Sequence, residues 1–197
     1  MSKKYCGYIS IIGKPNVGKS SIINSILKKK VSITSRKSQT TRNNILGIKT
    51  TNNKQSIFID TPGLHIKSKK TMNKILNKSA QSIIEDSDIV LFVMQRLSMI
   101  EEDLLIISKL KETNPLTICV INKIDQIDNK QKLLPFIENI SSKYNFDSII
   151  PISAKTNQNI DDLVTKIEDN LPENEHIYDE KFMVNSNDNK FMISELI

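Results

Sequence analysis

Short runs of isoleucine, valine and phenylalanine alternate along the chain with longer stretches in which apolar residues recur every three or four positions. The first pattern is typical of buried strands and the second of helices with one buried face. Strands are predicted over residues 5–12, 45–51, 56–60, 89–94, 116–121 and 148–152, and helices over residues 19–27, 71–85, 101–111, 130–144 and 160–170. The alternation indicates an α/β fold, with a mostly parallel six-stranded sheet and helices on both faces.

The pattern changes after residue 171. Residues 172–189 are polar and partly acidic, which predicts a linker after a first domain of residues 1–171. Residues 190–197 begin an apolar helical pattern and then stop, so we expect the start of a second, truncated domain there.

Composition narrows the class of protein but says little about its partners. The 197 residues are 38% hydrophobic and 25% charged, as in a soluble globular protein, and no apolar run is long enough to cross a bilayer. The N-terminus shows no cleavage site of a signal peptide, so a cytoplasmic protein is expected. The net charge of +6 accompanies a general richness in lysine and isoleucine, so it is weak evidence for a nucleic-acid surface.

A glycine-containing loop joins the first predicted strand to the first predicted helix. Residues 13–20 read GKPNVGKS, which fits the pattern GxxxxGK[ST]. In such a loop the backbone N–H groups face a phosphate chain, Lys19 reaches the β- and γ-phosphates, and Ser20 ligates Mg²⁺. The loop therefore predicts a nucleoside triphosphate site.

A second loop, DTPG at residues 60–63, follows the strand predicted over residues 56–60. Open α/β sheets bind ligands at the carboxyl ends of their strands. Asp60 would hold Mg²⁺ through a water molecule, and the Gly63 N–H would meet a γ-phosphate. By itself DTPG is also an ordinary turn, but three of the five glycines of the chain lie in these two loops.

Two further loops suit recognition of guanine. In NKID at residues 122–125, Asp125 would accept hydrogen bonds from guanine N1–H and N2–H, which adenine cannot supply. In SAK at residues 153–155, a backbone N–H would contact guanine O6. GTP and GDP are therefore the expected ligands.

These four motifs, in this order, resemble those of translation-factor-related GTP-binding proteins. With residues 31–42 (VSITSRKSQTTR), they are similar in detail to bacterial GTPases of the Era family, over nearly the whole chain. The resemblance implies a P-loop GTPase domain (G domain) over residues 1–171 and hydrolysis of GTP to GDP and phosphate. It also implies that residues 190–197 begin a KH-type RNA-binding domain, although no glycine for its GxxG clamp follows Pro172.

The resemblance further implies how the phosphate is cleaved. Thr40 or Thr41 would ligate Mg²⁺ when GTP is bound, and Thr41 is favoured. Leu64 stands where small GTPases use a glutamine to orient water, so intrinsic hydrolysis is expected to be slow. By the same resemblance, Asn16 would help to bind a potassium ion. This ion would neutralise negative charge in the transition state, as an arginine does in other GTPases.

The partners follow from the resemblance alone. They are the small ribosomal subunit and its 16S rRNA, in whose maturation such a switch takes part, together with peripheral contact with the inner membrane. A monomer is expected.

The predicted nucleotide-binding residues are Gly13, Lys14, Pro15, Asn16, Val17, Gly18, Lys19, Ser20, Ser21, Asp60, Thr61, Pro62, Gly63, Asn122, Lys123, Ile124, Asp125, Ser153, Ala154 and Lys155. The predicted catalytic residues are Lys19, Thr41 and Gly63, and the predicted metal ligands are Ser20, Thr41 and, through water, Asp60. Two alternatives stay open: a guanine-nucleotide-responsive binding module with negligible turnover, and a truncated fragment without function.

Overall fold

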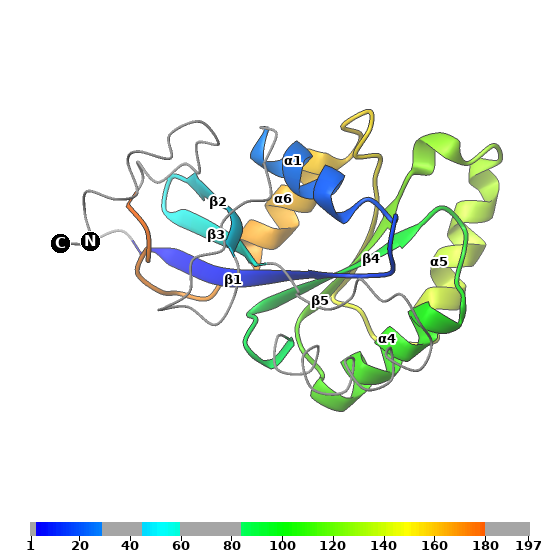
Figure 1. The fold of residues 1–197 in the computed structure, drawn as a ribbon, viewed down its shortest axis with the longest axis horizontal. Coiled ribbons are helices and arrows are strands. Elements are labelled where there is room, and N and C mark those ends of the chain that lie inside the picture. Colours follow the sequence, from blue (N-terminus) through cyan, green and yellow to red (C-terminus); the bar gives the residue numbers. More distant parts are fainter. Residues whose placement is uncertain (1–2, 29–44, 60–83, 180–197) are drawn as a thin grey trace.

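The computed structural model describes residues 3–28, 45–59 and 84–179. The strands are β1 (Tyr5–Ile12), β2 (Ile45–Thr51), β3 (Lys54–Ile59), β4 (Ile89–Gln95), β5 (Thr117–Asn122) and β6 (Ser148–Pro151). The helices are α1 (Lys19–Leu27), α4 (Glu101–Thr113), α5 (Leu133–Ser141) and α6 (Ile160–Asp169), with single turns of 3-10 helix at η2 (Ile124–Gln126) and η3 (Lys130–Lys132) (Figure 1).

The six strands form one sheet in the order β2-β3-β1-β4-β5-β6. Every neighbouring pair is parallel except β2 and β3, which form an antiparallel hairpin. The carboxyl ends of the parallel strands lie at one edge of the sheet, so the loops that follow β1, β4, β5 and β6 gather there. The predicted fold class is confirmed.

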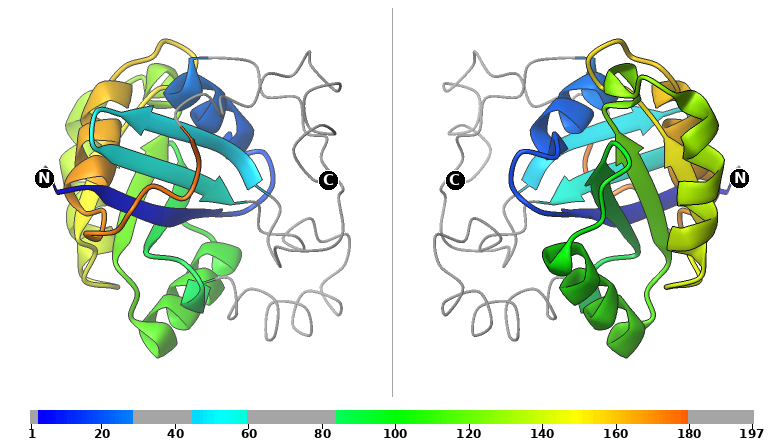
Figure 2. Two further views of the ribbon diagram at one scale, coloured as in Figure 1. Left: turned by 90° about the vertical axis from the view of Figure 1, so that its left-hand side faces the viewer. Right: turned by 90° about the vertical axis from the view of Figure 1, so that its right-hand side faces the viewer.

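Helices cover the sheet on both faces (Figures 1 and 2). On one face, α1 and α6 pack through Ile22, Ile26 and Leu163 against a core that includes Ile9 and Val120. On the other face, residues of α4 and α5 pack over β4 and β5 in a second core. The buried strands are nearly all apolar because both faces are covered.

A third, smaller apolar cluster lies on the β1–β3 half of the sheet. Cys6, Ile57 and Ile59 form its buried part, and Tyr178 from the end of the described chain packs against it. No helix of the described ranges contributes to this cluster. The C-terminal segment therefore covers this part of the sheet.

The ends of several elements differ from the prediction. β3 begins two residues before the predicted position 56, because its pairing with β2 continues to Thr51 and Lys54 at the hairpin turn. The helix predicted over residues 130–144 starts as the 3-10 turn η3, and its α-helical part is limited to Leu133–Ser141. Pro135 lies in the first turn of α5, where its missing N–H is not needed.

Parts of the prediction fall outside the described ranges, including residue 60 and residues 71–83 of the helix predicted over residues 71–85. No helix in the described part of the chain is long and apolar enough to cross a membrane.

Candidate nucleotide-binding site

The predicted phosphate loop, residues 13–20, runs from the end of β1 into the first turn of α1, as its sequence predicts. Gly13 has a φ of +148° and Gly18 a φ of +100°, which side chains rarely allow. A Cβ atom on Gly13 would lie 2.4 Å from the Val93 carbonyl oxygen, and one on Gly18 would lie 2.3 Å from Nδ2 of Asn122. Both glycines are therefore required by the close approach of β4 and β5 to the loop.

Lys19 closes the loop at the first turn of α1. Its ammonium group donates hydrogen bonds to the carbonyl oxygens of Gly13, at 2.8 Å, and Lys14, at 2.9 Å. Ser20 and Ser21 follow in the same turn and are exposed. The start of a helix carries N–H groups without helical partners, so this end favours an anion.

Asn122 joins three segments that are far apart in the sequence. At the end of β5, and only 2% exposed, it donates through Nδ2 to the Val17 carbonyl oxygen at 2.8 Å. Its Oδ1 accepts from the backbone N–H of Ala154 at 3.1 Å. The phosphate loop and the two predicted guanine loops are therefore held as one unit.

Lys123 also connects the phosphate loop to the loop that follows β5. Its ammonium group donates to the Asn16 carbonyl oxygen at 2.6 Å and to Oε1 of Gln95 at 2.6 Å. Lys123 has a φ of +65° and Asn16 a φ of +64°, so both residues turn in the left-handed region. Gln95 was not predicted as a site residue, and only its position at the carboxyl end of β4 would have indicated it.

Asp125 and Ser153, from the two predicted guanine loops, are joined by a hydrogen bond. The Ser153 hydroxyl donates to Oδ1 of Asp125 at 2.7 Å and accepts from the Thr156 N–H at 3.2 Å. Ser153 is fully buried, whereas Asp125 is exposed. The hydroxyl thus fixes one oxygen of a carboxylate that remains open to a ligand. Ile124 is buried beside it, and Lys155 is exposed.

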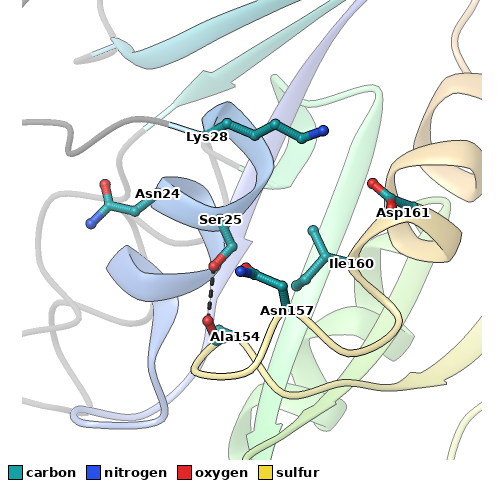
Figure 3. A pocket seen from close by; sticks show the side chains of 7 residues that line it. All are labelled: Asn24, Ser25, Lys28, Ala154, Asn157, Ile160 and Asp161. Atoms are coloured by element: carbon teal, nitrogen blue, oxygen red, sulfur yellow. Dashed lines mark hydrogen bonds between the residues drawn. The ribbon is translucent and has the colours of Figure 1, made fainter.

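A cleft opens beside the loop that contains Ala154, between α1 and α6 (Figure 3). Its lining residues are Asn24, Ser25, Lys28, Ala154, Asn157, Ile160 and Asp161. The Ser25 hydroxyl of α1 donates to the Ala154 carbonyl oxygen at 2.9 Å, so α1 holds this loop in place (Figure 3). Among the predicted site residues that the structure describes, only Ala154 lines the cleft, which is therefore adjacent to the predicted guanine loops.

Lys14 differs from the other loop residues. Its ammonium group forms an ion pair with Oδ2 of Asp103 at 2.9 Å, with exposures of 9% for Lys14 and 0% for Asp103. The same oxygen accepts from the Ile100 N–H at 3.0 Å, which caps α4. The Lys14 side chain is thus bound to α4, and its backbone remains for the nucleotide. The sequence did not predict this ion pair, because the two residues are 89 positions apart.

Other predicted residues fall outside the described ranges: Thr40, Thr41, Asp60, Thr61, Pro62, Gly63 and Leu64. Within the ranges that are described, no cluster of three or more His, Cys, Asp or Glu side chains could hold a metal ion. The exposed hydroxyl of Ser20 would suit a different kind of Mg²⁺ site, one without such a cluster. In that kind of site the ion has few protein ligands, and the phosphates of a bound nucleotide supply others.

Residues 8–123 match a family of proteins described as 50S ribosome-binding GTPases. The chain belongs to this GTPase family. Within the family it is similar to GTPase Era from Haemophilus influenzae strain KW20, at 45% identity over 195 residues, and from Pasteurella multocida, at 43% over 196 residues. These alignments cover 99% and 100% of this chain but only 64% of each relative.

Two solved Era structures share the G-domain fold. One is Era in complex with MgGDPNP and a segment of 16S ribosomal RNA, and the other is a variant of Aquifex aeolicus Era bound to GDP and AlF4⁻. Each has a TM-score of 0.76 and 38% identity, and they cover 91% and 92% of this chain and 61% and 62% of those chains. The resemblance to the Era GTPases that the motifs indicated is confirmed.

Proposed function

We propose that this protein is a guanine-nucleotide switch that binds GTP and hydrolyses it to GDP and phosphate. One observation carries the proposal: Asn122 binds both Val17 in the phosphate loop and Ala154 in the predicted guanine loop. A phosphate site and a base site held in this fixed relation suit a single nucleotide. The GTPase family of the chain supports the same conclusion.

In this proposal the phosphate loop binds the phosphate chain. The backbone N–H groups of residues 13–18, except Pro15, which has none, and those at the start of α1 face the phosphates. Lys19 exchanges its two loop carbonyl partners for phosphate oxygens. Ser20 would ligate Mg²⁺, as would the predicted ligands Thr41 and, through water, Asp60. When bound, Mg²⁺ would neutralise charge on the phosphates. The structure of the Era relative in complex with MgGDPNP supports Mg²⁺ as the metal.

The base is selected by Asp125, Ser153 and Ala154. Ser153 holds one carboxylate oxygen of Asp125 at 2.7 Å, which directs the carboxylate to guanine N1–H and N2–H. An adenine base would leave the carboxylate without these donors. Lys123 holds the guanine loop against the phosphate loop, because its ammonium group donates to the Asn16 carbonyl oxygen.

Hydrolysis in this proposal is slow without a partner. Leu64 cannot orient a water molecule, and Asn16 would help to hold a potassium ion, which when bound would supply the missing positive charge. A second candidate function is a binding module that responds to guanine nucleotide but hydrolyses GTP at a negligible rate. Leu64 supports this candidate, because it cannot orient the attacking water, whereas membership of the GTPase family supports hydrolysis.

We further propose that the switch acts in maturation of the small ribosomal subunit through 16S rRNA. The Era relative with a segment of 16S rRNA supports this partner. The chain spans only 64% of the length of each relative, and only residues 190–197 are predicted to belong to the KH-type domain that would bind RNA. The monomeric state, the cytoplasmic location and the peripheral membrane contact stay predictions of the resemblance and composition.

The proposal is tested by binding and by single-turnover hydrolysis. Fluorescent GDP should bind at least ~100-fold more tightly than fluorescent ADP, because the two guanine donors are missing in adenine. Hydrolysis of γ-labelled GTP is then followed with and without small ribosomal subunits. Acceleration by the subunits supports the switch, hydrolysis absent in both supports the binding module, and equal affinity for the two bases contradicts the proposal.

A further inference from the structure

Ser25 of α1 forms a hydrogen bond with the predicted guanine loop, although it belongs to none of the four motifs. Its hydroxyl donates to the Ala154 carbonyl oxygen at 2.9 Å, and both residues line the cleft between α1 and α6 (Figure 3). The two residues are 129 positions apart in the sequence. The helix that begins at the phosphate loop therefore also contacts the loop that would read the base.

Packing fixes the side of α1 on which Ser25 lies. Ile22 and Ile26 are buried in the core that also contains Ala154 and Ile160. Ser25 lies three residues after Ile22 and directly before Ile26, so it shares their side of the helix. Its side chain is half-buried there. The contacts that hold α1 on the sheet thus also bring the Ser25 hydroxyl to the loop.

Most backbone N–H groups at the start of this loop already have acceptors. The acceptors are the Gln158 carbonyl oxygen for Ser153, at 3.1 Å, Oδ1 of Asn122 for Ala154, at 3.1 Å, and the Ser153 hydroxyl for Thr156, at 3.2 Å. Among residues 153–156, only the Lys155 N–H has no acceptor in the described part of the chain. Lys155 is also an exposed residue, so its N–H is the donor that this part of the loop can offer to a ligand.

The hydrogen bond from Ser25 acts on the peptide unit that carries this N–H. The Ala154 carbonyl group and the Lys155 N–H belong to one planar trans peptide, in which they point in opposite directions. A donor on α1 that holds the carbonyl group therefore also sets the direction of the N–H, away from α1. The preceding peptide is fixed as well, because Asn122 accepts from the Ala154 N–H. Side chains from α1 and β5 thus restrict two adjacent peptides of the loop.

We propose that Ser25 is a positioning residue for base recognition, which holds the peptide between Ala154 and Lys155 so that the Lys155 N–H donates to guanine O6. The inference rests on the proposed function, because it names a further determinant of the same base site. Ser153 joins this loop to Asp125, the residue proposed to accept from guanine N1–H and N2–H. Adenine carries an amino group in place of O6, so the two contacts would reject adenine at different atoms.

Base analogues separate this contact from that of Asp125. In 6-thio-GDP a sulfur atom, which is a weak acceptor, replaces O6, whereas N1–H and the 2-amino group are kept. In IDP the 2-amino group is absent and O6 is kept. The affinities of the whole chain for GDP, 6-thio-GDP and IDP are measured by competition against fluorescent GDP in the presence of Mg²⁺. The preference for GDP over 6-thio-GDP then reports the contact with O6, and the preference for GDP over IDP reports Asp125.

Three variants at Ser25 change only the donor. Ser25→Ala removes the hydroxyl, Ser25→Thr keeps one, and Ser25→Cys replaces it with a weakly donating thiol. The parent chain should bind GDP at least ~10-fold more tightly than 6-thio-GDP, about the factor for one hydrogen bond. Ser25→Ala should reduce this preference at least ~3-fold, Ser25→Cys should give an intermediate value, and Ser25→Thr should keep the parent value. The preference for GDP over IDP should be the same in all of them.

Ser108→Ala is the matched control. The Ser108 hydroxyl donates to the Leu105 carbonyl oxygen within α4, at 2.7 Å and at an exposed position. The control therefore removes a helical serine hydroxyl without touching the loop, and both preferences should stay at the parent values. Urea denaturation shows that each variant is folded, which is expected because alanine favours helix.

A merely structural role for Ser25 has a different result. If Ser25→Ala weakens binding of GDP, 6-thio-GDP and IDP by one common factor, the hydrogen bond stabilises the loop without directing the N–H, and the inference is overturned. An unchanged affinity for all three nucleotides would overturn it too. So would a Ser25→Thr variant that loses the preference for GDP over 6-thio-GDP as fully as Ser25→Ala.

Failure of the proposed function gives another pattern. A parent chain that binds none of the three nucleotides would overturn the proposed function and, with it, the role of Ser25. A parent chain that binds GDP and prefers it to IDP, but not to 6-thio-GDP, would overturn the role of Ser25 alone. The two failures are therefore distinguishable in the same competition experiment.

Discussion

The ammonium group of Lys14 and the carboxylate of Asp103 form an almost fully buried ion pair, 2.9 Å apart, between the phosphate loop and α4. They are 89 residues apart in the sequence. Asp103 also caps α4 through the Ile100 N–H, so one carboxylate fixes both the start of the helix and the second residue of the loop. The loop is therefore positioned by a helix as well as by the strand that precedes it.

Asp103→Asn is expected to lower the free energy of unfolding by about 3 kcal/mol, because it leaves the buried Lys14 ammonium group without a counter-charge. The introduced amide can still accept from the Ile100 N–H, so the cap is kept and the change isolates the ion pair. Urea denaturation measures the effect. Glu112→Gln removes the partner of Lys109 in the more exposed pair of the same helix and should change stability by less than ~1 kcal/mol. Similar effects of the two variants would contradict a special role for the buried pair.

Gln95→Leu is expected to accelerate dissociation of GDP by roughly 3- to 10-fold. The substitution removes one of the two acceptors that hold the Lys123 ammonium group, so the contact with the Asn16 carbonyl oxygen weakens. Chasing a fluorescent GDP with excess unlabelled GDP gives the rate. Gln126→Leu is the matched control, because Gln126 accepts from the exposed Arg96. An unchanged rate in Gln95→Leu would show that Gln95 does not position the site.

Asp125→Asn should shift the preference of the site from guanine toward xanthine. The oxygen of the introduced amide would still accept from Ser153, so the loop is expected to keep its conformation while the base pairing changes. Affinity for GDP should fall at least ~100-fold relative to XDP, measured by competition against a fluorescent nucleotide. Asp128→Asn, at an exposed position nearby, serves as the control. If guanine preference survives in Asp125→Asn, another residue reads the base.

Potassium should accelerate GTP hydrolysis at least ~10-fold over sodium at equal ionic strength, because an ion near Asn16 would stabilise transition-state charge. Asn16→Gly should abolish the difference. Glycine adopts the φ of +64° found at this position, so the loop conformation is kept without the side-chain amide. Phosphate release under single-turnover conditions provides the rates. Equal rates in the two salts would exclude potassium assistance and favour the slow binding module.

Much of the fold was predictable because its elements have strong local signals. β1, β2 and α1 have the predicted bounds, since their apolar patterns end at glycine-containing or polar turns. The predicted start of β3 was wrong by two residues, because pairing with β2 extends a strand beyond its apolar run. The motif residues of the site were predicted from their spacing and from their places at the carboxyl ends of strands, and those that the structure describes lie together at one edge of the sheet.

The sequence by itself determined the alternation of strands and helices, the four motifs and the GTPase family that they indicate. These features are local, because hydrophobic periodicity and loop chemistry are set by neighbouring residues. Only the tertiary structure decided that Lys14 pairs with Asp103, that Gln95 holds Lys123, and that Gln55 binds residues 177 and 178. Each of these contacts joins residues far apart in the chain. Such contacts depend on the order of the strands in the sheet and on the face of the sheet on which each residue lies. Local sequence patterns do not specify either of these.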